Sequence, residues 1–93
     1  MDEKEILWTD YFLHRAKVRH LDLATIERIV RYSNERYWDQ VSGRIVVVGR
    51  AGKQLLTIPY EEKEQTFTPI TAHVTTRAQV SSRIRDGRYS IHE

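Results

Sequence analysis

The sequence predicts an α+β domain with two N-terminal helices, a four-stranded antiparallel sheet and a C-terminal helix. Helical apolar spacing fills the first third of the chain, apolar runs separated by glycine turns fill the middle, and a capping motif stands at Thr76. Because the predicted connections are short, an antiparallel meander is the natural sheet. No repeat or Pro/Gly/Ser-rich linker interrupts the 93 residues, so we expect one domain over 1–93, with 1–7 and 90–93 as frayed tails.

The first third of the chain predicts two helices. Thr9 or Asp10 can cap the first helix, which runs to about Arg19, and Asp22 is a good N-cap for the second. Ser and Asn at 33–34 end the second helix, because their side chains compete for backbone hydrogen bonds. The apolar residues expected on the inner faces are Phe12, Leu13 and Ala16 in the first helix and Leu23, Ile26, Ile29 and Val30 in the second.

Four strands are predicted in the middle of the chain, over 35–40, 44–50, 54–60 and 67–75. Turns at Gly43 and Gly52 connect the first three. Proline has no N–H to donate to a ladder, so Pro59 and Pro69 are expected at an edge or a bulge. Simple alternation along the fourth strand predicts Ile70, Ala72 and Val74 on one face and Phe67, Pro69, Thr71 and His73 on the other.

The last predicted helix begins at Thr76. Thr76 and Gln79 form a capping box, in which the hydroxyl accepts from an early N–H and the Gln side chain reaches back. Val80 and Ile84 lie four residues apart on its inner face, and Gly87 ends it.

Composition excludes several classes of protein. The absence of cysteine excludes disulfide scaffolds and thiol nucleophiles. The longest apolar run, 45–48, is far shorter than the roughly 20 residues that cross a membrane, so no membrane partner is expected. The net charge of +2 conceals a basic segment over 11–36, and arginine is the commoner basic residue. Arginine suits bidentate contacts with phosphate, but it is also common on solvent-exposed faces. The sequence leaves open whether these arginines bind phosphate or are only solvated.

Motifs for metal or nucleotide chemistry are absent from the sequence. The four histidines, at 14, 20, 73 and 92, do not have the His-x-x-x-His spacing of a metal site, and there is no P-loop or Gly-x-Gly-x-x-Gly motif. We therefore expect neither a metal nor a cofactor.

Three motifs, spread over residues 8 to about 89, resemble BrnT-like toxins of the RelE/ParE superfamily. Together they agree in order and spacing with that family, including related small domains of uncharacterised function. The motifs are Trp8 twelve residues before His20, Gly49-Arg50-Ala51-Gly52 followed by Leu55-Leu56 and Tyr60-Glu61, and Ile70-Thr71-Ala72-His73 followed by Thr75-Thr76-Arg77.

This resemblance implies a small bacterial ribonuclease toxin of a type II toxin–antitoxin pair. It implies a cytoplasmic protein with a RelE-like fold whose concave sheet face meets RNA, including ribosome-bound mRNA. A cognate antitoxin protein would hold it inactive. The chain departs from the family pattern at Thr9, Phe12, Gln79 and His73, where the family commonly has arginine at the last position.

Metal-independent RNA cleavage needs a base for the 2′-hydroxyl, an acid for the leaving oxygen and positive charge on the phosphate. The candidate catalytic residues are His73, His20 and Tyr60. Each has a structural alternative: a surface histidine, a histidine that fixes the helix junction, and a core ring in phase with its strand neighbours.

The candidate phosphate-binding residues are Arg19, Arg50, Arg77 and Arg83. Arg77 stands at a predicted helix N-terminus, where backbone N–H groups favour anions. Arg83 belongs to a group with Arg85 and Arg88 that suits RNA backbone contacts, an acidic antitoxin surface or simply a solvated face.

Two functional interpretations follow from the sequence. The first is a ribonuclease, which we expect to bring His20, Arg50, His73 and Arg77 together in one cleft. The second is a non-catalytic RNA-binding or protein-interaction module of the same fold, for which scattered positions are expected.

Overall fold

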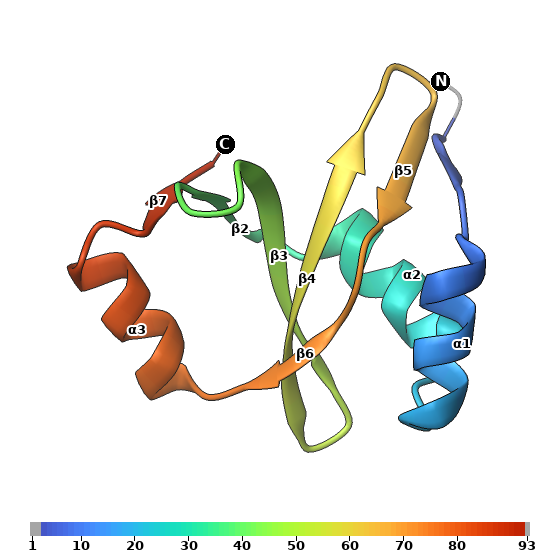
Figure 1. The fold of residues 1–93 in the computed structure, drawn as a ribbon, viewed down its shortest axis with the longest axis horizontal. Helices are drawn as coiled ribbons and strands as arrows, with labels where there is room; N and C mark the ends of the chain where they lie inside the picture. The colour runs from blue at the N-terminus through green and yellow to red at the C-terminus, as the bar shows by residue number, and fades with distance from the viewer. Residues whose placement is uncertain (1–2, 93) are drawn as a thin grey trace.

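The chain folds as three helices and seven strands in the computed structural model, which describes residues 3–92. The elements in chain order are β1 (Glu5–Ile6), α1 (Asp10–Val18), α2 (Leu23–Tyr32), β2 (Glu35–Asp39), β3 (Arg44–Ala51), β4 (Gln54–Glu62), β5 (Thr66–Pro69), β6 (His73–Thr75), α3 (Arg77–Arg85) and β7 (Tyr89–Ile91). Figure 1 shows α1 and α2 on one side of the central strands and α3 on the other. The predicted α+β class is confirmed.

The three helices begin where their capping residues predicted. The Thr9 hydroxyl accepts from the Phe12 N–H at 3.0 Å, and the Thr76 hydroxyl accepts from the Gln79 N–H at 3.1 Å. The reciprocal half of the capping box is different, because the Gln79 side chain accepts from the Thr75 hydroxyl instead of reaching back. Asp22 stands at the N-cap of α2 without a side-chain cap hydrogen bond.

The sheet is larger than the four strands that the sequence predicts. Its strand order is β1-β5-β4-β3-β2-β7, with β6 also pairing with β4. All pairs are antiparallel except β1 with β5, so the sheet is mixed. Of the two additional edge strands, β1 lies within the expected tail 1–7 and β7 overlaps the expected tail 90–93 at residues 90–91, so these parts of the chain are ordered strands and not frayed. Residues 1–2 and 93 lie outside the described part of the chain.

The predicted fourth strand is broken into β5 and β6 by residues 70–72, and the break reverses its side-chain alternation. Phe67 packs against the core on the side of α1 and α2, whereas His73 pairs with Thr57 on the opposite face. The prediction that Phe67 and His73 share a face is therefore wrong. Pro69, which ends β5, is buried and lacks the N–H that would continue the ladder.

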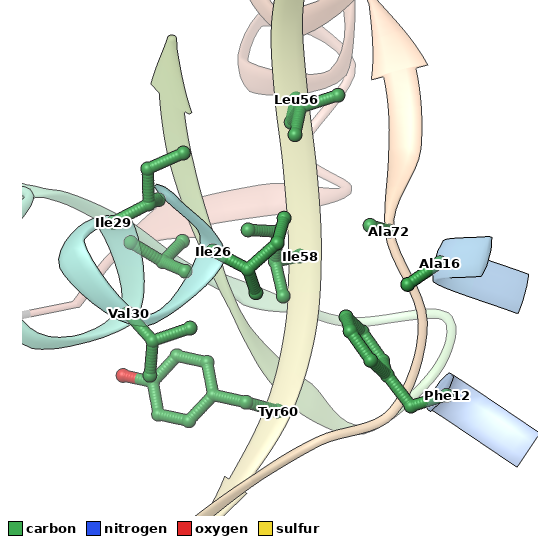
Figure 2. Packing of buried hydrophobic residues seen from close by; sticks show 10 residues of the cluster. Phe12, Ala16, Ile26, Ile29, Val30, Leu56, Ile58, Tyr60 and Ala72 are labelled. Atoms are coloured by element: carbon green, nitrogen blue, oxygen red, sulfur yellow. The ribbon is translucent and has the colours of Figure 1, made fainter. Parts of the chain in front are cut away.

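Each face of the sheet has its own apolar cluster. The larger cluster lies under α1 and α2 and is built from Phe12, Ala16, Ile26, Ile29, Val30, Val47, Leu56, Ile58, Tyr60 and Ala72 (Figure 2). The smaller cluster lies under α3 and joins Val48, Leu55 and Val80, with Tyr37 packed against it. Because α3 contributes only one buried residue, the second face stays partly open beside it.

The close packing of α2 on β3 depends on Gly49. A Cβ at this position would lie 2.6 Å from Ile29 Cγ2 and 2.8 Å from Ile29 Cγ1. The glycine therefore lets the helix approach the strand. No helix in residues 3–92 has the length and apolar character needed to cross a membrane.

Candidate functional site

A cleft of about 400 Å³ opens on the second face of the sheet, between α3, β6 and β7. Val46 and Pro59 contribute to its lining from the central strands. Its principal polar residues are Asp39, Thr57, His73, Arg83, Arg88 and Tyr89. These residues come from five different elements or their flanking turns, so the cleft exists only in the assembled fold.

A buried ion pair holds one wall of the cleft. Asp39 is 3% exposed and accepts from Arg88 Nε at 2.9 Å and from Arg88 Nη2 at 3.1 Å. The Val41 N–H and the Ser42 hydroxyl also donate to this carboxylate. Burial alone would raise the pKa of Asp39, but these donors outweigh it and lower the pKa to about 2. Asp39 is therefore ionised at neutral pH and fixes the Arg88 guanidinium in place.

Tyr89 adds a hydroxyl group that is fixed from two sides. Its ring stacks on Tyr37 with centroids 5.4 Å apart and an interplanar angle of 15°. Its hydroxyl oxygen accepts from Arg83 Nη1 at 3.3 Å, and the guanidinium carbons of Arg83 and Arg88 lie 5.7 and 5.9 Å from the ring centroid. Tyr89 is only 4% exposed but lines the cleft, and its hydroxyl can donate a hydrogen bond while it accepts from Arg83.

His73 lies in β6 and lines the same cleft. Its pKa is lowered from the ordinary 6.5, first by burial and then by the positive charges of Arg19, Arg15 and Arg83. The imidazole is therefore predominantly neutral at pH 7 and has a lone pair that can accept a proton. A neutral histidine among arginines is the arrangement that a base acting near a phosphate requires.

Two of the sequence-predicted residues, His73 and Arg83, meet in the cleft. Arg19 lies close to them, because its Nη1 donates to the carbonyl oxygen of Ala72. Arg83 is the only phosphate-binding candidate that lines this cleft among the described residues.

The other four candidates lie elsewhere. Tyr60 is 2% exposed in the larger core, and its hydroxyl accepts from Arg36 Nη1 at 2.9 Å, so the ring has the structural role that its strand phase indicated. His20 has φ 57° in the exposed turn between α1 and α2. Arg50 is exposed near the β3–β4 turn, and Arg77 is paired with Glu35 at 2.6 Å. His20, Arg50, His73 and Arg77 therefore do not converge.

Sequence reasoning missed Asp39 and Tyr89 and treated Arg88 only as a member of an arginine group. A signal for Tyr89 was present, because 89–91 continue with alternating apolar residues after Gly87 and can form a strand. Asp39 gave no such signal, since an aspartate beside a turn is common and its partner is 49 residues away.

No group of three or more His, Asp or Glu side chains suited to a metal ion is present within residues 3–92. Comparisons with protein-family models, with curated proteins and with solved structures found no match.

Proposed function

We propose that the cleft binds single-stranded RNA and cleaves it without a metal ion. The observation that carries this proposal is the meeting of a neutral histidine, a tyrosine hydroxyl and two arginines in one cleft, from His73, Tyr89, Arg83 and Arg88. These groups match the base, the acid and the positive charge that the reaction needs.

In the proposed reaction, His73 removes the proton of a ribose 2′-hydroxyl, and the resulting oxygen attacks the adjacent phosphorus. A bond forms between O2′ and phosphorus, and the bond from phosphorus to O5′ breaks, which leaves a 2′,3′-cyclic phosphate. The departing O5′ takes the hydroxyl proton of Tyr89. Arg83 and Arg88 stabilise the charge on the phosphate during this step.

The sequence resemblance further supports a toxin of a type II toxin–antitoxin pair, acting on mRNA in the bacterial cytoplasm. An antitoxin that covered the cleft with carboxylates would neutralise Arg83 and exclude RNA. Expression without the antitoxin should stop growth, and His73→Ala should restore it. Normal growth with intact mRNA would contradict the toxin proposal.

The direct test incubates purified protein with a single-stranded RNA oligonucleotide in the presence of EDTA. We expect cleavage that yields 2′,3′-cyclic phosphate ends. The cleavage rate of His73→Ala should be lower than that of the wild type by a factor of at least about 100, because positioned acid–base groups contribute at least this factor. The matched controls are His14→Ala and Arg85→Ala, which remove an exposed histidine and an exposed arginine outside the cleft lining. Equal rates for His73→Ala and His14→Ala would refute the assignment.

A non-catalytic RNA-binding module is the second candidate, and one observation favours it. The four residues that the sequence assigned to a common cleft are scattered, so the original catalytic constellation does not form. This candidate predicts that the protein binds RNA without cleaving it and that Arg83→Ala weakens binding. The same oligonucleotide experiment separates the two candidates.

A further inference from the structure

Positive charge continues from the cleft around β6 to the C-terminal half of α1. β6 pairs with β4 and with no other strand in the described residues, so its outer edge is open. Helix α1 packs on the opposite face of the sheet, where Ala16 lies beside Ala72 in the larger cluster (Figure 2). Since Ala72 directly precedes His73, α1 brings its side chains to the strand that carries the proposed base.

Two arginines of this segment, Arg15 and Arg19, lie one helical turn apart, and Arg19 reaches the residue that directly precedes β6. Arg19 Nη1 donates to the carbonyl oxygen of Ala72, which holds the guanidinium at the strand edge. The Arg15 guanidinium lies 5.8 Å from the Tyr11 ring centroid, and its Nε is buried with no hydrogen-bond partner in the structure as described. A buried donor without a partner is costly, so a ligand that drew the Arg15 guanidinium outward would relieve this cost.

Neither guanidinium is neutralised by a carboxylate. The ion pairs found within residues 3–92 use Lys4, Arg31, Arg44, Arg77 and Arg88 as their cations. Arg15 and Arg19 are both close enough to His73 for their charges to contribute to its lowered pKa, as does Arg83 from α3. His73 is therefore flanked by cations from two helices on opposite faces of the sheet.

We infer that the RNA strand leaves the cleft over the outer edge of β6 and that Arg15 and Arg19 bind a second phosphate there. This inference rests on the proposed function. It extends the substrate from one phosphodiester to an RNA strand that passes around the β6 edge from one face of the sheet to the other. The planar fork of arginine suits this contact, and an unpaired arginine releases counterions when it binds phosphate.

The test measures binding of a 2′-O-methyl RNA oligonucleotide, which has no free 2′-hydroxyl and stays uncleaved. Fluorescence anisotropy over a range of KCl concentrations gives the slope of log K against log salt. Each phosphate contact to a single strand contributes about 0.7 to this slope, so we expect Arg15→Ala/Arg19→Ala, which removes one phosphate site, to reduce it by about 0.7. Arg28→Ala/Lys53→Ala removes the same charge from exposed positions on α2 and the β3–β4 turn and should leave the slope unchanged.

Arg15→Gln serves as a second variant, because it keeps the Arg19 hydrogen bond to Ala72 and should reduce the slope by less than the double variant does. Equal slopes for the Arg15/Arg19 variant and the charge-matched control would overturn the inference. If the wild type cleaves RNA and the slope is unchanged, only the second phosphate site fails. If the slope falls but no RNA is cleaved, the phosphate site stands and the catalytic proposal fails.

Discussion

Replacement of Asp39 by asparagine should lower the free energy of unfolding by about 2 kcal/mol at pH 7. The carboxylate is 3% exposed and holds Arg88 through two hydrogen bonds. Its pKa is about 2 in the folded protein and 3.8 ordinarily, and each unit of difference corresponds to about 1.36 kcal/mol. Breaking a fully buried ion pair costs about 3–5 kcal/mol, and the partial exposure of the Arg88 side chain, 35%, explains the smaller value.

The effect should depend on pH in a defined direction. A carboxyl group whose pKa is lower in the folded state contributes its full stability above the unfolded pKa and loses it as the pH falls. The difference between wild type and Asp39→Asn should therefore shrink from about 2 kcal/mol at pH 7 to about 1 kcal/mol at pH 3. Urea denaturation at both pH values measures this difference, and the melting temperature at pH 7 should fall by roughly 8–16 °C.

Glu61→Gln is the matched control, because it removes a carboxylate from the exposed ion pair with Arg44. Exposed pairs contribute about 0.2–1 kcal/mol, so this variant should remain close to wild type. Equal effects of Asp39→Asn and Glu61→Gln would refute this role of Asp39, as would an effect of Asp39→Asn that is the same at pH 7 and pH 3.

Four further predictions concern separate parts of the molecule. Gly49→Ala should lower stability by about 1–3 kcal/mol, and less in an Ile29→Ala background that removes the clash, as a double-mutant denaturation cycle can measure. Arg36→Leu should lower the free energy of unfolding by about 2 kcal/mol in the same assay, because it leaves the acceptors of three hydrogen bonds without their donor. Thr9→Ala should cost about 1 kcal/mol through the lost helix cap, with Thr9→Ser near wild type. The RNA cleavage rate should rise with pH as His73 loses its proton. Because the pKa of His73 lies below 6.5, the rate should already exceed half of its maximum at pH 6.5, and a midpoint above pH 7 would exclude His73 as the base.

The helices were predictable because their signals are local. Thr9 and Thr76 cap the helices at the predicted positions, and the apolar residues of α2 are buried at Ile26, Ile29 and Val30. Caps and helical periodicity depend on residues within four positions of one another, so one sequence contains all the information needed. The three central strands were predictable for a similar reason, since tight turns connect them.

The edges of the sheet and most of the cleft depend on contacts between distant residues. β7 pairs with β2 across about 50 residues, and β1 pairs with β5 across about 60. Short strands of two or three residues have too little alternation to be recognised alone. The pairing of Asp39 with Arg88 follows from the β2–β7 register, so neither residue could be assigned to the cleft before that register was known.

The interruption between β5 and β6 affects how this protein can tolerate insertions and deletions. Because successive side chains of a strand point to opposite faces, a change of one residue in the length of 70–72 that shifted the register of β6 on β4 would exchange the faces to which His73 and Val74 point. Substitutions in the same three positions would leave that orientation intact. Connections between strands usually accept changes in length more readily than the elements they join. In this protein the usual tolerance is reduced, because the number of residues in this segment is constrained as well as the identity of Ala72, which is buried in the larger cluster.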